Sequence, residues 1–166
     1  MNQTIMRNEL VNLGGGAFAI AFQILGNPDD AADAVQDSIV TVLGAPRAYD
    51  PQRGALKPWF FRVVRNRALD CLKQRKASVL PSDELLDPAP GPQTNAEQTE
   101  RDSALWAALK GISIEHREMI VLRDYLGLSY AEIADILGIA LGTVMSRIHR
   151  ARLALRDKLH NDGGLL

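Results

Sequence analysis

A proline-rich, acidic stretch divides this chain and restricts it to two small domains. Residues 78–99 contain four of the eight prolines in the 166-residue sequence, and proline interrupts helices and central strands. Residues 83–102 hold six acidic residues and one basic residue. We therefore predict a first domain at residues 1–77, an acidic linker at residues 78–99 and a second domain at residues 100–166.

The composition favours an all-α protein. Hydrophobic residues make up 46% of the chain but aromatic residues only 5%, which disfavours a β-sandwich or barrel. The formal net charge of −1 creates no global field for nucleic acid. A single cysteine, Cys71, excludes an internal disulfide and a multi-thiolate zinc site. The sequence shows neither a long apolar run nor a basic-then-apolar leader, so we expect a cytoplasmic protein without membrane insertion.

Three helices are predicted in the first domain. Residues 17–25 form an apolar helix, frayed at its start by the glycines at 14–16. Asn27 is followed by proline and two aspartates, which is typical of a capped helix start. An irregular loop at residues 44–56 precedes a long helix at residues 57–76.

The long helix separates its apolar and basic residues. Residues 57–76 include seven Lys or Arg and one acidic residue, Asp70. At about 100° per residue, one arc collects the apolar side chains Leu56, Trp59, Phe60, Val63, Val64 and Cys71. The opposite side collects Arg62, Arg65, Asn66, Lys73 and Lys76. Such a stripe suits a phosphate backbone, and a solvated charged face is the alternative.

Four helices are predicted in the second domain, and the last two form a helix–turn–helix. Ser129 and Glu132 have the spacing of a capping box. Ala134, Gly138 and Val144 have the spacing at which two helices meet across a tight turn.

The last helix, from about residue 141 to 159, carries the candidate DNA contacts. In a helix–turn–helix the early residues of the second helix meet base edges in the major groove. Those predicted to do so are Thr143, Ser146, Arg147 and Arg150, with His149, Arg152 and Arg156 available for phosphates. An ordinary helical hairpin with a charged exterior is the alternative.

The remaining reactive residues do not indicate an enzyme. The three histidines, at positions 116, 149 and 160, give no dense set of metal ligands. Cys71 lies on the apolar arc, where a buried thiol is expected. Asp33 and Asp37, one helical turn apart, suggest a docking surface.

These motifs together resemble the bacterial sigma-70 family. The first-domain motifs are NPDDAADAVQD at 27–37, RAYDPQRG at 47–54 and WFFRVVRNRALD at 59–70; those of the second are LSYAEIA at 128–134 and GTVMSRIHRAR at 142–152. They look like sigma regions 2 and 4. Two such regions joined by a short linker are the layout of extracytoplasmic-function (ECF) sigma factors.

The resemblance implies a promoter-specificity factor that acts with core RNA polymerase and needs no cofactor or metal. It implies that region 2 docks on the β′ clamp helices through Asp33, Gln36 and Asp37, and that region 4 meets the β flap. It further implies promoter DNA contacts and regulation by an anti-sigma factor. The −10 contacts implied are Tyr49, Arg53, Lys57, Arg62, Arg65, Asn66, Lys73 and Lys76; the −35 contacts are Thr143, Ser146, Arg147, His149, Arg150 and Arg152.

The chain departs from the family pattern at several positions. Met145 stands where the family commonly has lysine, which removes a phosphate contact and predicts a gentler salt dependence. Val42 and Leu43 replace a basic-aromatic helix end, and the glycines at 14–16 replace a more polar first helix. Two alternatives stay open: a sigma mimic that titrates an anti-sigma factor, and a stand-alone helix–turn–helix repressor.

Overall fold

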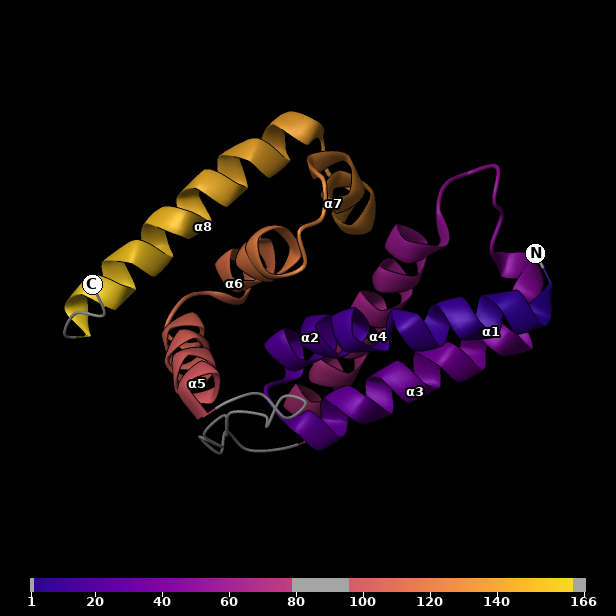
Figure 1. Cartoon of the computed structure of the whole chain (residues 1–166), viewed down its shortest axis with the longest axis horizontal. Helices are drawn as coiled ribbons and strands as arrows, with labels where there is room; N and C mark the ends of the chain where they lie inside the picture. The colour runs from indigo at the N-terminus through magenta and orange to yellow at the C-terminus, as the bar shows by residue number, and fades with distance from the viewer. Residues whose placement is uncertain (1, 79–95, 163–166) are drawn as a thin grey trace.

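The chain folds into helices on both sides of the predicted linker (Figure 1). The structure is a computed structural model that describes residues 2–78 and 96–162, and every regular element in these ranges is helical. The N-terminal half contains α1 (Gln3–Asn12), α2 (Gly14–Leu25), α3 (Pro28–Gly44), the 3₁₀ turn η1 (Pro46–Ala48) and α4 (Leu56–Ser78). The C-terminal half contains α5 (Ala96–Lys110), α6 (Ile114–Ile120), the π-helical segment η2 (Val121–Tyr125), α7 (Tyr130–Leu137) and α8 (Leu141–Asn161). The all-α prediction is confirmed.

The predicted helix starts are capped as their sequences indicate. The side chain of Asn27 accepts hydrogen bonds from the backbone N–H groups of Asp29 and Asp30 at 2.9 and 3.0 Å. At the start of α7, Ser129 and Glu132 each accept from the other's backbone N–H in a capping box. These bonds satisfy amides that have no partner inside the helix.

The start of the chain differs from the prediction. A helix that was not predicted, α1, precedes α2, and α2 begins at Gly14 rather than fraying there. A Cβ atom built on Gly16 would lie 2.8 Å from the ring of Phe61 and 3.5 Å from Leu126. Glycine is therefore required where α2 closely approaches α4 and the C-terminal half, and the surrounding contacts outweigh its poor helix propensity.

The linker and the region after it also differ in detail. The helix α5 begins at Ala96, inside the segment predicted as linker, whereas residues 79–95 lie outside the described residues. The helix that begins after Ser113 changes to π-helical geometry at Val121. Among the described residues, no helix is both long and apolar enough to cross a membrane.

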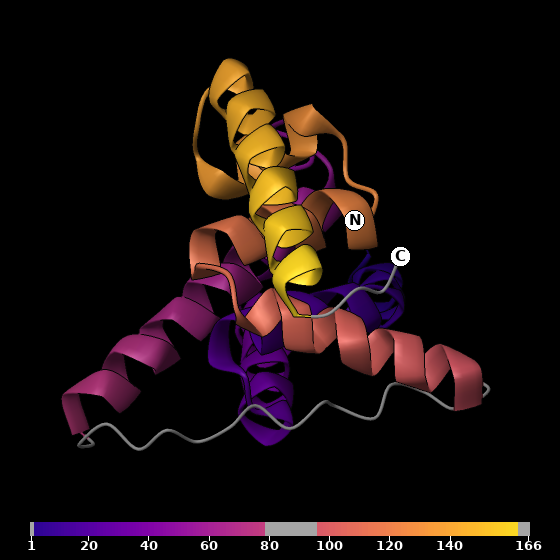
Figure 2. The ribbon, with the colours of Figure 1, turned by 90° about the vertical axis from the view of Figure 1, so that its left-hand side faces the viewer.

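The two halves share one hydrophobic core. Helix α2 packs on α3 and α4, and α6 and α7 pack on α8. The halves meet where α4 contacts α7 and α2 contacts α6. In the side view of Figure 2 the C-terminal half lies in front of the N-terminal half. Phe60 and Val64 of α4 and Ile133 and Ile136 of α7 belong to the same buried cluster. The predicted domains are therefore packed together in this structure.

We predict opposite effects of alanine at two neighbouring glycines. Gly15→Ala meets nothing within 4 Å, so the better helix former should stabilise the fold by about 0.5–1 kcal/mol. Gly16→Ala places a methyl group against the buried Phe61 ring and should destabilise by about 1–3 kcal/mol. Thermal unfolding should give a higher midpoint for the first variant and a lower one for the second, and midpoints that move together would contradict the assigned contact.

Candidate nucleic-acid interface

The helix–turn–helix is formed by α7 and α8, as predicted. Gly138 ends α7 in the left-handed conformation, with φ of 66°, which glycine adopts without strain. Val144, Ile148 and Ala151 of α8 are buried in the core. Burial of this face turns the opposite side of α8 outward.

Five of the predicted −35 contacts lie together on or beside that outward side. Ser146, His149 and Arg150 are exposed, and Thr143 and Arg147 are half-buried. The Ser146 hydroxyl donates to the backbone oxygen of Thr143 at 3.1 Å, and Arg150 Nε donates to that of Ser146 at 3.4 Å. These contacts are local to α8, so the side chains can be redirected to DNA without breaking tertiary structure.

The sixth predicted contact, Arg152, lies apart from this group. Its Nη2 donates to Asp124 Oδ1 at 2.7 Å and its Nε donates to Asp124 Oδ2 at 3.2 Å. The hydrogen bond to Asp124 raises the pKa of Arg152 above its usual value. The structure therefore gives Arg152 a carboxylate partner within the C-terminal half.

The predicted −10 contacts begin in the loop before α4. The Tyr49 ring packs on Trp59 with ring centroids 5.2 Å apart, and its hydroxyl donates to the Gly54 backbone oxygen at 3.0 Å. Desolvation raises the pKa of Tyr49, with smaller contributions from Glu9 and Asp50. Arg53 is highly exposed in the same loop, 3.9 Å from Asp50.

Two arginines of the predicted basic stripe pair with carboxylates of the C-terminal half. Arg65 forms a two-pronged ion pair with Glu118 of α6, in which Nη2 donates to Oε2 at 3.2 Å. Arg62 Nη1 lies 3.7 Å from a carboxylate oxygen of Asp135 in α7. The exposed fractions are 22% and 9% for the side chains of Arg65 and Glu118, but 42% and 51% for Arg62 and Asp135.

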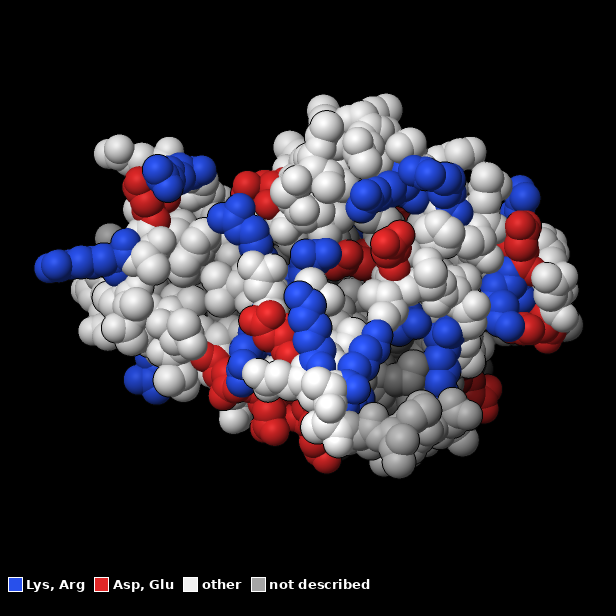
Figure 3. All heavy atoms as spheres, turned by 180° about the vertical axis from the view of Figure 1, so that it is seen from behind, with Lys and Arg blue, Asp and Glu red and all other residues white. Residues whose placement is uncertain are grey.

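The remaining members of the stripe are accessible. Asn66, Lys73 and Lys76 are exposed, and Lys57 is half-buried. Figure 3 shows that Lys and Arg side chains are interspersed with Asp and Glu on the back of the molecule. Because Arg62 and Arg65 are paired with Asp135 and Glu118, the packed halves do not present the stripe as a continuous basic surface.

The predicted polymerase-docking residues lie on the exposed side of α3. Asp33, Gln36 and Asp37 are all exposed. Asp37 accepts from Arg67 of α4 at 2.8 and 3.2 Å, and this hydrogen bond raises the pKa of Arg67. Asp33 and Asp37 also line a shallow groove between α3 and α4, together with the half-buried Cys71.

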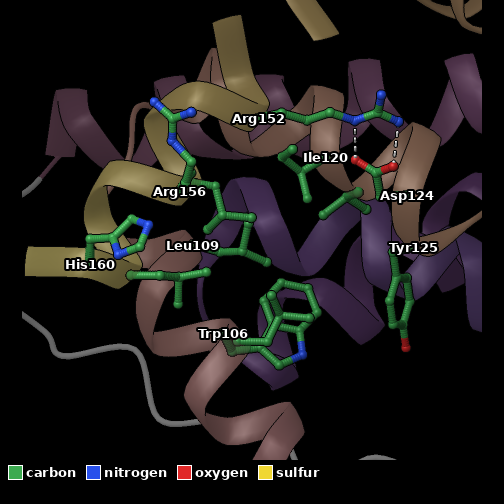
Figure 4. A pocket seen from close by; sticks show the side chains of 12 residues that line it. Trp106, Leu109, Ile120, Asp124, Tyr125, Arg152, Arg156 and His160 are labelled. Atoms are coloured by element: carbon green, nitrogen blue, oxygen red, sulfur yellow. Dashed lines mark hydrogen bonds and ion pairs between the residues drawn. The ribbon is translucent and has the colours of Figure 1, made fainter. Parts of the chain in front are cut away.

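A largely apolar cavity in the C-terminal half was not predicted. It has a volume of about 460 Å³, and it is formed by α5, α8 and the segment around η2 (Figure 4). Trp106 and Leu109 contribute its apolar wall, and Arg152, Arg156 and His160 lie along its edge. Its residues come from three separate segments and share no spacing, so the sequence carries no signal for it. Among the described residues, no group of three or more His, Cys, Asp or Glu side chains could hold a metal ion.

Comparisons with known proteins identify the family. Residues 10–78 match the family described as Sigma-70 region 2, and residues 102–155 match Sigma-70, region 4. The ECF RNA polymerase sigma factor EcfG of Rhodopseudomonas palustris is 30% identical over 162 residues, which cover 95% of this chain and 87% of that protein. The chain belongs to the sigma-70 family. This sigma factor is of the ECF type, and such proteins are transcription initiation factors rather than enzymes.

A further relative and two solved structures support the same family assignment. The ECF sigma factor SigE of Mycolicibacterium smegmatis is 39% identical over 149 residues, or 86% of this chain; the match spans 56% of that protein's length. Among solved structures, Bartonella quintana RpoE in complex with the anti-sigma factor NepR superposes with a TM-score of 0.74 at 27% identity, covering 93% of this chain and 96% of that one. CnrH in complex with the cytosolic domain of CnrY gives a TM-score of 0.69 at 30% identity, covering 98% and 92%.

We predict unequal contributions from the two ion pairs between the halves. Glu118→Gln leaves Arg65 beside a neutral group in a largely buried site and should lower the free energy of unfolding by about 1–3 kcal/mol. Asp135→Asn removes an exposed pair and should cost no more than about 0.5 kcal/mol. Urea unfolding of both variants compares the two sites, and equal losses would contradict this difference.

Proposed function

We propose that this sigma factor binds core RNA polymerase and directs it to promoters through a −10 contact in region 2 and a −35 contact in region 4. The observation that carries the proposal is the exposed side of α8, where Ser146, His149 and Arg150 project from a helix–turn–helix. Arginine can bind guanine with two hydrogen bonds, and serine or threonine can bind bases or phosphates. The polymerase supplies the chemistry, so the sigma factor contributes recognition alone.

In region 2, α4 and the loop before it hold the separated non-template strand of the −10 element. Tyr49 and Trp59 provide aromatic surfaces on which unstacked bases can pack, and such stacking offsets the cost of opening the duplex. Lys57, Asn66, Lys73 and Lys76 supply further polar and cationic contacts. Arg62 and Arg65 join them once their pairs with Asp135 and Glu118 are exchanged for DNA phosphates.

The polymerase contacts use two other surfaces. The acidic side of α3, with Asp33, Gln36 and Asp37, suits a basic partner surface, which we assign to the β′ clamp helices. The apolar cavity beside α8 suits a hydrophobic helix of the β flap.

The proposal includes two further points: the sigma factor acts in the cytoplasm, and an anti-sigma factor regulates it there. The two similar structures were solved with NepR and with the cytosolic domain of CnrY. A regulator that covers the acidic side of α3 and the apolar cavity would remove both polymerase contacts. The complexes of these two similar proteins support regulation in which the docking surfaces are covered.

Run-off transcription from pooled genomic fragments tests the proposal against the open alternatives. Core polymerase with this protein should produce discrete start sites that core polymerase alone does not. Binding to neither core nor promoter DNA would favour a sigma mimic. Sequence-specific DNA binding without polymerase would favour a stand-alone repressor.

We predict that Arg150→Ala weakens −35-dependent initiation at least about fivefold, because a paired arginine contact to a base contributes about 1–3 kcal/mol. The side chain is exposed, so folding should not change. Abortive initiation from a promoter with a −35 element measures the effect, and Arg7→Ala, which removes an exposed arginine on the distant helix α1, serves as the control. Equal activity of the wild type and Arg150→Ala would remove Arg150 from the recognition surface.

We predict that Asp33→Arg weakens binding to core polymerase about tenfold or more, because a reversed charge opposes a basic partner surface. Glu9→Arg reverses an exposed charge on α1 and should leave binding within about twofold. Fluorescence anisotropy of labelled sigma factor titrated with core enzyme provides the affinities. Equal affinities for the two variants would exclude docking through the acidic side of α3.

A further inference from the structure

Two large apolar side chains are exposed at the start of the DNA-facing helix. Leu141 is 51% exposed and Met145 is 54% exposed, and they lie one turn apart on α8. In Figure 3 an uncharged projection stands where Figure 1 places the start of α8, and Lys or Arg side chains gather beside it. The described part of the chain leaves about half of each of these two residues uncovered.

The charges near Leu141 and Met145 indicate what kind of partner binds over them. Residues 141–156 contain four arginines and no acidic residue. Arg152 and Arg156 pair with Asp124 and Asp157, so the positive charge near the start of α8 comes from Arg147 and Arg150. His149 follows Met145 by one turn, and Ser146 is its neighbour in sequence. A partner that fits this part of α8 is therefore negatively charged but offers an apolar group at the helix start. DNA meets both conditions, because the major groove of a polyanionic duplex exposes the thymine C5-methyl group as its apolar feature.

We propose that Met145, backed by Leu141, contacts a thymine methyl group in the −35 element and so determines specificity at that position. The inference rests on the proposed function, since it requires α8 to enter the major groove. The unbranched thioether of methionine is flexible and polarizable, which lets it follow a methyl group on the groove floor. A lysine at this position would instead favour a phosphate and carry no preference for thymine.

The expected size of the effect follows from the buried methyl group. Removal of one buried methyl group weakens binding about fourfold. Met145→Ser loses the contact but changes only an exposed side chain, so folding should be unaffected. Met145→Lys adds a phosphate contact and should steepen the slope of log K against log salt by about one.

The test uses the complete sigma factor bound to core polymerase and a promoter mapped by run-off transcription. Each thymine of the −35 element is replaced in turn by deoxyuridine, which lacks the methyl group but keeps the same hydrogen-bonding edge. Competition binding measures the affinity of the wild type, Met145→Ser and the control Ile5→Ser, whose side chain is exposed on the distant helix α1. Circular dichroism confirms that the three proteins share the same fold.

The inference expects a loss of about fourfold at one or two deoxyuridine positions for the wild type and Ile5→Ser, and none at those positions for Met145→Ser. The methyl contact is overturned if the polymerase complex protects the −35 element but deoxyuridine lowers the affinity equally in all three proteins. The proposed function would still stand in that case. A −35 element without thymine on either strand would also overturn the methyl contact and leave the proposed function standing. Absence of any −35 protection overturns the proposed function and this inference together.

Discussion

Arg117 joins the C-terminal ends of two helices from opposite halves of the chain. Its Nη1 donates to the Gln23 backbone oxygen at 2.7 Å, in the last turn of α2. Its Nε and Nη2 donate to the Leu109 and Ile112 oxygens at 3.0 and 3.3 Å, at the end of α5. Carbonyl groups at helix C-termini have no partner inside the helix and carry partial negative charge. A single guanidinium therefore satisfies both helix ends and fixes them relative to each other.

Arg117 is a buried cation, and burial disfavours its charged form. Burial lowers the pKa of Arg117, and the residue is 9% exposed. The three carbonyl oxygens offset the cost of removing the charge from water. The next residue, Glu118, pairs with Arg65, so two consecutive positions of α6 provide polar links to α2 and α4. The side-chain oxygen of Gln23, buried nearby in α2, has no hydrogen-bond partner within the described structure.

Local chemistry accounts for what the sequence could predict. The caps at Asn27 and Ser129 and the left-handed Gly138 depend on neighbours within a few residues, and all three are present. The apolar arc of α4 was largely right because helical spacing determines which side faces the core, and Phe60 and Val64 are buried.

Long-range contacts account for what the sequence could not predict. Arg65 and Glu118 are 53 residues apart, and no spacing rule connects them. The same holds for Gly16, whose helical conformation depends on the approach of Phe61 and Leu126. A basic stripe shows that cations lie on one side of a helix, but not whether carboxylates or phosphates face them. The same reasoning missed the cavity, because its walls come from segments that meet only in the folded protein.

Under the proposed function, the two DNA surfaces differ in what must change before they can be used. The exposed side of α8 is accessible while the halves are packed together, whereas Arg62 and Arg65 are occupied by Asp135 and Glu118. Exchange of these carboxylates for phosphates preserves the charge pairing, so ion pairs alone impose a modest barrier. The larger cost is apolar, because separation of the halves removes the close approach of Gly16 to Leu126 and the packing of α4 on α7. Salt screens charges but does not weaken apolar burial. High ionic strength therefore does not open this interface by itself, and a partner that supplies new apolar contacts, such as core polymerase, is required to expose the region 2 stripe.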